Sequence, residues 1–205
     1  MKSIDEARLE EDLGYRFGYL REFIGFDEED VAAIRTVIGQ LAPRIPAMVE
    51  ATYEKLLSYD ATARHFLPRQ AGYDGPTPGG LEALSGSDPQ IQFRKEHLQR
   101  YFMNLLGHSY NDKMAVYLDM VGKMHTPKAG NAAIDVPLVQ MNALMGLVSD
   151  VLWDTIARLD LDHETTLRVG RAFGKLMWLQ NDFIVRHYAG DASRAGAVHS
   201  GYSQA

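Results

Sequence analysis

The chain has 205 residues, of which 46% are apolar and 23% charged, a composition typical of one well-packed globular domain. Its formal net charge is −6 at pH 7 and it has no run of Lys and Arg, which argues against nucleic acid or an anionic membrane as a main partner. Cysteine is absent, which excludes disulfides, thiolate catalysis and iron–sulfur clusters. No apolar run reaches the roughly 18 residues of a membrane span and the acidic start is no signal peptide, so we expect a cytoplasmic protein.

Hydrophobic residues recur with helical spacing along the whole chain, and no stretch alternates with period two, so the prediction is an all-α protein. Caps, prolines and glycines set the expected boundaries. The expected elements are a flexible leader at 1–11, an extra N-terminal helix at 12–24, helices at about 27–41 and 46–59, a surface loop at 69–87, helices at about 88–107, 111–125, 137–158 and 162–188, and a disordered tail at 191–205. The folded domain is expected to span residues 12–190.

His125 is the last member of an otherwise apolar helical stripe that begins at Met114. Pro127 removes a backbone donor and disfavours helix for the residue before it, so the helix should stop beside the histidine. An imidazole at a helix end, aimed into a core next to a loop that can yield, suits an axial ligand of haem. The alternative is a core histidine whose ring nitrogens bond to nearby carbonyls.

Further residues could form a site around this histidine. Tyr53 lies centrally on the inner stripe of its helix, either bonded to a carbonyl or free to donate a hydrogen bond to a ligand. Six apolar residues could wall a pocket or simply pack the core: Ile91, Leu98, Phe102, Leu144, Leu147 and Val151. His97 and His65 are weaker candidates for a second metal ligand, and the edge of a pocket suits His97 better. The carboxylate pairs of a di-metal bundle are absent, as are the common hydrolase and nucleotide-binding motifs.

An ordered set of short segments resembles the protoglobins and the sensor domains of globin-coupled sensors. These segments are GYRFGY at 14–19, TYEKLL at 52–57 with RHF at 64–66, FRKEHL at 93–98, YLD through GKMH at 117–125, and VPL at 136–138. The resemblance implies a globin fold, a 3-over-3 helical sandwich, with an extra N-terminal helix, that binds haem b. It also implies reversible binding of a diatomic gas such as O2, CO or NO.

Under this resemblance His125 is the proximal ligand of the haem iron, and Tyr53 and Leu98 lie on the distal side, where the gas binds. Leu98 cannot ligate iron, so the ferrous iron should be five-coordinate with an open site. Thr52 stands where protoglobins commonly have a Trp, while Phe66 and Met124 complete the expected haem contacts. By analogy with the family, we expect a homodimer through the last two long helices and a signalling partner protein.

Two other functions stay open at this point. The first is haem redox catalysis, such as NO dioxygenation or peroxidase turnover, although no reductase segment is present. The second is a globin-like interaction module without haem, against which the inward position of His125 argues. No intrinsic enzymatic output is expected.

Overall fold

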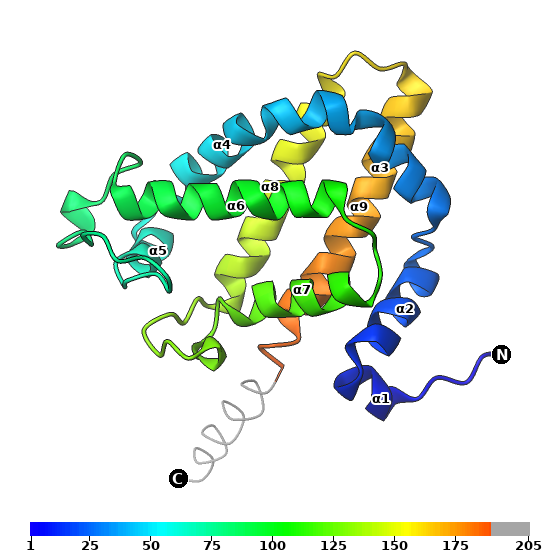
Figure 1. Ribbon diagram of the computed structural model, residues 1–205, viewed down its shortest axis with the longest axis horizontal. Coiled ribbons are helices and arrows are strands. Elements are labelled where there is room, and N and C mark those ends of the chain that lie inside the picture. The colour runs from blue at the N-terminus through cyan, green and yellow to red at the C-terminus, as the bar shows by residue number, and fades with distance from the viewer. Residues whose placement is uncertain (190–205) are drawn as a thin grey trace, which may run out of the picture.

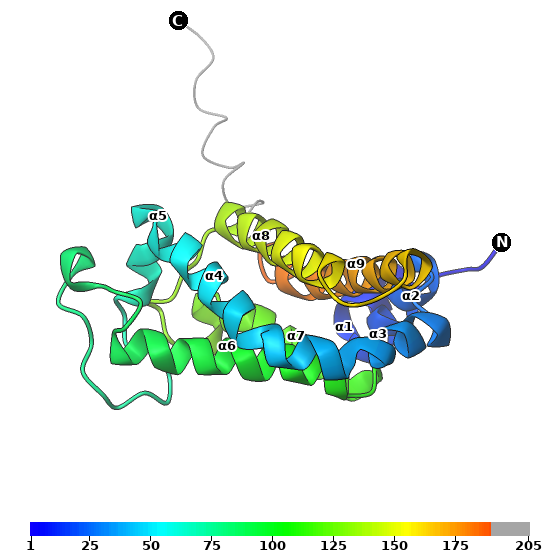
Figure 2. The ribbon, with the colours of Figure 1, turned by 90° about the horizontal axis from the view of Figure 1, so that it is seen from above.

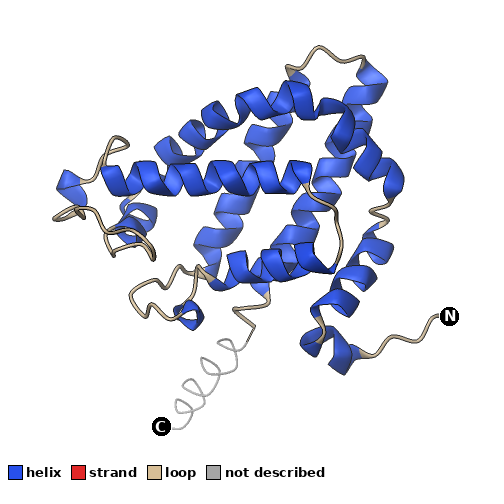
Figure 3. Ribbon diagram, in the orientation of Figure 1, coloured by secondary structure: helices blue, strands red, loops and turns tan. Residues whose placement is uncertain are grey.

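A computed structural model describes residues 1–189 and shows only helices, turns and loops within that range (Figures 1 and 3). The all-α prediction is therefore confirmed, while the predicted tail at 191–205 lies outside the described residues. The α-helices are α1 (Glu6–Glu11), α2 (Leu13–Ile24), α3 (Glu28–Leu41), α4 (Ile45–Leu57), α5 (Asp60–Ala63), α6 (Pro89–Gly107), α7 (Asp112–Lys123), α8 (Leu138–Ala157) and α9 (His163–Val185). Short 3-10 turns cover Ala42–Arg44, Arg64–Phe66, Leu81–Ala83 and Pro127–Ala129.

Side-chain caps explain why several helices begin where the sequence indicates. The Asp27 carboxylate accepts from the Glu29 and Asp30 backbone amides, and the Asp30 carboxylate accepts from the Asp27 backbone amide, which closes a capping box at the start of α3. Asp88 accepts from the Gln90 amide at 2.8 Å, and Pro89 occupies the first position of α6, where its missing N–H has no helical partner to lose.

The structure differs from the expected flexible leader at residues 6–11, which form α1. Asp5 caps this helix, and two arginines donate to its carbonyls: Arg16 of α2 to the Leu9 carbonyl, and Arg186, far along the chain, to the Glu10 carbonyl. A helix of six residues is too short to be stable alone in water. Contacts from α2 and from the far end of the chain therefore order it.

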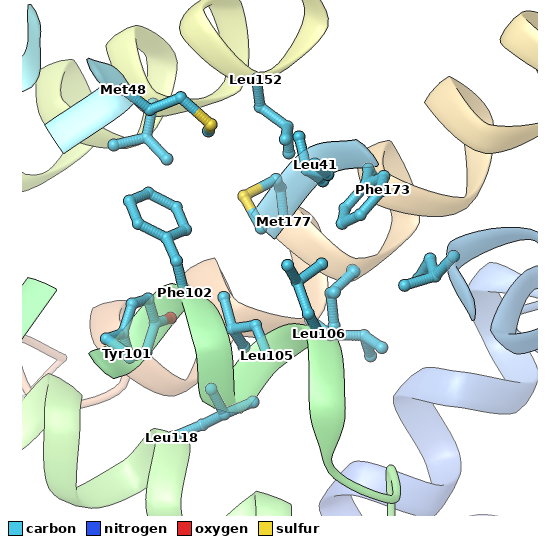
Figure 4. Close-up of a cluster of buried hydrophobic side chains, with 14 of the residues drawn as sticks. Leu41, Met48, Tyr101, Phe102, Leu105, Leu106, Leu118, Leu152, Phe173 and Met177 are labelled. Carbon is cyan, nitrogen blue, oxygen red and sulfur yellow. The ribbon is translucent and has the colours of Figure 1, made fainter. Parts of the chain in front are cut away.

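The long helices lie in two layers, with α8 and α9 side by side over α6 and α7 (Figure 2). Helix α9 packs against α3, α7 and α8, while α4 packs against α6 and α8. A cluster of buried apolar side chains from α3, α4, α6, α7, α8 and α9 fills the space between them (Figure 4): Leu41, Met48, Phe102, Leu105, Leu106, Leu118, Leu152, Phe173 and Met177. This core holds α4, α6, α7 and α8 at fixed positions around the cavity described next. Within residues 1–189, no helix has both the length and the apolar character needed to cross a membrane.

Candidate functional site

A cavity of about 420 Å³ lies among α4, α6, α7, α8 and α9. Its size is within the range of cofactor and ligand pockets in proteins. Methionine, leucine, valine and aromatic side chains form most of the wall: Leu56, Phe66, Leu98, Phe102, Met120, Val121, Met124, Val136, Met141, Leu144, Met145, Val148 and Ile184. The other lining residues carry polar groups, among them His125, Tyr53 and Arg94, and these decide what the cavity can bind.

His125 stands at the end of α7 with its ring facing this cavity. Helix α7 ends at Lys123, and the His125 amide bonds the Gly122 carbonyl at 3.2 Å, so the histidine lies in the turn that ends the helix. The Val136 amide donates to the His125 carbonyl at 3.0 Å and fixes the following loop to this turn. The predicted break before Pro127 therefore places the ring at the cavity wall.

The protonation of His125 follows from its contacts. Nδ1 lies 2.8 Å from the Val121 carbonyl oxygen, which can only accept, so Nδ1 carries the proton. Burial lowers the pKa of His125 to about 4, with Arg94 adding to the fall and the Val121 bond opposing it. At neutral pH the ring is therefore uncharged, and Nε2 keeps a lone pair that is available to a metal.

Tyr53, on α4, forms another part of the wall together with the Phe66 ring 5.6 Å away. Burial raises the pKa of the Tyr53 hydroxyl, and the neighbouring Arg94 guanidinium partly offsets that rise. The hydroxyl is thus protonated at neutral pH and can act as a hydrogen-bond donor. Arg94, on α6, also lies over the Phe66 ring at 4.8 Å and donates to the Gln70 side chain.

Among residues 1–189, no group of three or more His, Asp or Glu side chains could hold a metal ion. Two buried polar atoms on cavity-lining residues, Tyr101 Oη and Gln180 Oε1, have no hydrogen-bond partner in the described part of the chain. Such atoms are expected where a ligand or water completes the site.

The protoglobin family model matches residues 13–194. The chain belongs to the protoglobin family. The globin domain of the Geobacter sulfurreducens globin-coupled sensor is similar in structure, with a TM-score of 0.66 over 83% of this chain and 96% of that domain, at 17% sequence identity. This likeness confirms the predicted globin fold. No curated protein matches the chain.

In this protoglobin, seven of the predicted site residues line the cavity: His125, Tyr53, Phe66, Leu98, Phe102, Met124 and Leu144. The other four, Thr52, Ile91, Leu147 and Val151, do not line it. Thr52 is fully buried against the core, and its hydroxyl bonds the Met48 carbonyl of its own helix at 2.8 Å. Ile91 is likewise fully buried in the core.

On α8 the lining face of this protoglobin is slightly rotated from the expected one. Leu144 lines the cavity, as do Met145 and Val148, whereas Leu147 and Val151 turn aside and are half-buried. Successive helical residues point about 100° apart, so a change of one position decides which side chain reaches the cavity. The sequence periodicity marks the apolar side of α8 without fixing this angle.

The secondary histidines lie at the rim rather than at the centre. His97 is exposed, and its Nδ1 bonds the Phe93 carbonyl at 2.7 Å. His65 is half-buried, and burial lowers its pKa. With Arg94 and Arg100, these two rings supply the wall with groups suited to carboxylates.

Sequence reasoning missed the polar groups at this site, above all Arg94, Gln70 and Tyr101. One signal for Arg94 was available, because it precedes Leu98 by four residues and so shares its helix face. No comparable signal marks Gln70, which comes from the loop before α6.

The residues present fit haem, the cofactor that the globin fold implies. A neutral imidazole with a free Nε2 is a common axial ligand of haem iron, the wall is mainly apolar, and cationic groups stand where carboxylates could be held.

Proposed function

We propose that this protoglobin binds haem b in the cavity beside His125 and binds a diatomic gas reversibly, as a gas sensor or gas-binding protein. The observation that carries the proposal is His125: its Nδ1–H is committed to the Val121 carbonyl, and its Nε2 faces a cavity of about 420 Å³. When bound, haem would supply an iron atom able to coordinate O2, CO or NO.

The chain's own residues supply orientation, polarity and protection from water. The Val121 bond fixes the tautomer and angle of the His125 ring and increases its basicity. Tyr53 donates a hydrogen bond toward a polar diatomic gas, which slows its release, and CO gains less from such a bond than O2. Apolar side chains including Leu98 and Phe102 exclude water, and Leu98 leaves the distal side without a protein ligand.

The test is the visible spectrum of hemin-reconstituted protein, ferric and ferrous, with and without CO and O2. We expect a five-coordinate ferrous spectrum that shifts with each gas, and loss of stable haem binding in His125→Ala. His108→Ala is the matched control, because His108 is exposed and lies outside the cavity lining. No haem uptake by the wild type, or an unaltered spectrum in His125→Ala, would contradict the proposal. Sustained turnover with a supplied reductant would favour the redox enzyme instead.

The role of Tyr53 has its own test. Tyr53→Phe removes one hydroxyl and should speed O2 release about tenfold, as expected for the loss of one hydrogen bond of about 1.4 kcal/mol. CO release should change far less. Equal effects on both gases would show that the substitution acts on packing rather than on a hydrogen bond.

We further propose that the protein forms a homodimer through α8 and α9 and signals through a partner protein. Exposed apolar side chains on these helices support the dimer: Val139 (71% exposed) on α8, and Leu167 (46%) and Trp178 (68%) on α9. Leu167 and Trp178 are 11 residues apart and share one helix face. Sedimentation analysis should give a dimer for the wild type and a monomer for Trp178→Glu. A monomeric wild type would refute the dimer.

A further inference from the structure

We propose that Arg94 and Tyr53 form a binding site for a small planar oxyanion of the size of nitrite within the cavity. The inference deepens the proposed function, since haem would occupy the rest of the same space. It rests on the charge, partners and position of Arg94.

Arg94 is a half-buried cation on the cavity wall, and it has no anionic partner among the described residues. None of the ion pairs formed by residues 1–189 includes it. Its neighbours are the neutral Gln70 side chain and the Phe66 ring, whose centroid lies 4.8 Å from the guanidinium carbon. Burial lowers the pKa of Arg94, but an arginine begins so high that the guanidinium stays charged at neutral pH.

Within residues 1–189, other cations that are largely removed from solvent do have carboxylate partners. Lys95, the next residue on α6, lies 2.7 Å from both carboxylate oxygens of Glu50. Arg16 bonds the Asp182 carboxylate, at 2.9 Å for one of its contacts. Removing a charge even partly from water without a counter-charge is unfavourable, so the Arg94 environment favours an anion in the adjacent cavity.

That space is the cavity. Arg94, Tyr53 and Gln70 all line it, and the charge of Arg94 lowers the pKa of His125, which also faces it. The guanidinium presents a planar set of N–H donors that matches the two oxygens of a planar XO2 anion, and Gln70 accepts from only part of that set. Tyr53 packs on the same Phe66 ring as Arg94, with ring centroids 5.6 Å apart, and its hydroxyl adds a further donor to this part of the wall.

The surrounding structure holds two neighbours of the Arg94 guanidinium in place. Gln90 is fully buried, and its side-chain oxygen accepts from the Gln70 backbone amide at 3.1 Å. Its Nε2 donates to the Phe66 carbonyl at 2.7 Å. Gln90 therefore fixes the backbone of Gln70 and of Phe66, the two residues whose side chains Arg94 contacts. A guanidinium positioned in this way binds an anion with a smaller loss of side-chain entropy than a free one.

A haem carboxylate is the competing source of negative charge at Arg94, so the experiment must separate the two. Calorimetric titration with sodium nitrite at constant ionic strength, with sodium chloride as reference, is carried out on the haem-free chain and repeated on the ferrous, CO-bound haem-loaded protein, in which CO keeps nitrite from the iron. The variants are Arg94→Gln, Arg94→Lys, Tyr53→Phe and Arg171→Gln. Arg171 is the matched control, an exposed arginine on α9 that lies outside the cavity lining.

Nitrite should bind the wild type saturably and with 1:1 stoichiometry. Its affinity should fall about tenfold or more in Arg94→Gln, the loss expected for a charge-assisted hydrogen bond, and less in Arg94→Lys, which keeps the charge. Tyr53→Phe should also weaken binding, while Arg171→Gln should leave the nitrite affinity within about twofold, since an exposed charge outside the cavity contributes little. Circular dichroism checks that each variant is folded. If Arg94→Gln does not fold, the comparison is made between the wild type and Arg94→Lys.

Several results would overturn the inference. One is the absence of saturable nitrite binding, and another is equal affinity in the wild type and Arg94→Gln. Faster haem loss in Arg94→Gln with unchanged nitrite affinity would assign Arg94 to the haem carboxylate. Haem dimethyl ester has no free carboxylate, so a tenfold higher nitrite affinity in protein loaded with this ester than with haem would also assign Arg94 to the haem carboxylate. Failure to take up hemin would refute the proposed function before any titration, and the haem-free measurements would still decide the anion site.

Discussion

Gly122→Ala should force α7 and α9 apart where their backbones touch, three residues before His125. A Cβ added at Gly122 would lie 2.9 Å from the Ile184 Cα and closer still to the Phe183 carbonyl oxygen. Both are backbone atoms of α9, which cannot rotate away as a side chain could. The helices must therefore shift.

Two opposing effects set the size of the change. Alanine stabilises a helix interior by about 1 kcal/mol relative to glycine. Forcing an extra carbon into a closely packed contact costs about 1–3 kcal/mol. Because the obstacle is backbone, we expect the upper part of that range and a net loss of about 1–2 kcal/mol. For a chain of this size, that loss corresponds to a fall in melting temperature of roughly 2–8 °C.

Gly146→Ala in α8 is the matched control, since an added Cβ there meets no atom within 4 Å. This variant should be up to about 1 kcal/mol more stable than the wild type. Urea denaturation of the haem-free proteins, followed by circular dichroism, measures both changes. A Gly122→Ala variant as stable as the wild type would refute the reasoning, as would equal effects of the two substitutions. In the haem-loaded protein, Gly122→Ala should also release haem faster, because the Gly122 carbonyl accepts from the His125 amide.

Three further predictions concern charge and buried polar groups. The pKa of His125 is about 4 in the folded state and near 6.5 in the unfolded state, so the haem-free protein should lose at most about 3 kcal/mol of stability as the pH falls from 6.5 to 4, and none above that window. Urea denaturation at several pH values should show a flatter dependence of stability on pH for His125→Gln. The same pH dependence in wild type and variant would refute the assignment. Asp119→Asn breaks the ion pair with the largely buried Arg186 and should lower the free energy of unfolding by about 1–3 kcal/mol. Asp154→Asn breaks an exposed ion pair and should lower it by less than about 0.5 kcal/mol. Similar losses in the two variants would contradict the role assigned to burial. Gln90→Leu leaves backbone groups near the cavity without hydrogen-bond partners and should lower the free energy of unfolding by about 2–3 kcal/mol. Weaker nitrite binding is the second readout. A variant with wild-type stability would show that water replaces the side chain.

The sequence by itself determined the helices and the position of His125. Caps and prolines act on the neighbouring backbone, so Asp27, Asp88 and Pro89 mark helix starts without reference to the rest of the fold. The stop at Pro127 is equally local, and it leaves His125 at the end of an apolar face. These effects act within about one helical turn, so the residues that cause them are close together in the sequence and can be recognised there.

Only the tertiary structure decided which side chains reach the cavity and which groups they meet there. Val148 lines it in place of Leu147 because helix packing sets the rotation of α8, and periodicity does not resolve that rotation to one residue. Helix α1 depends on Arg186, which lies at the other end of the chain. Arg94 became a candidate anion site only when folding brought Phe66 and Gln70 against it. The contacts of a buried charge join residues far apart in the sequence, so their meaning appears once the chain is folded.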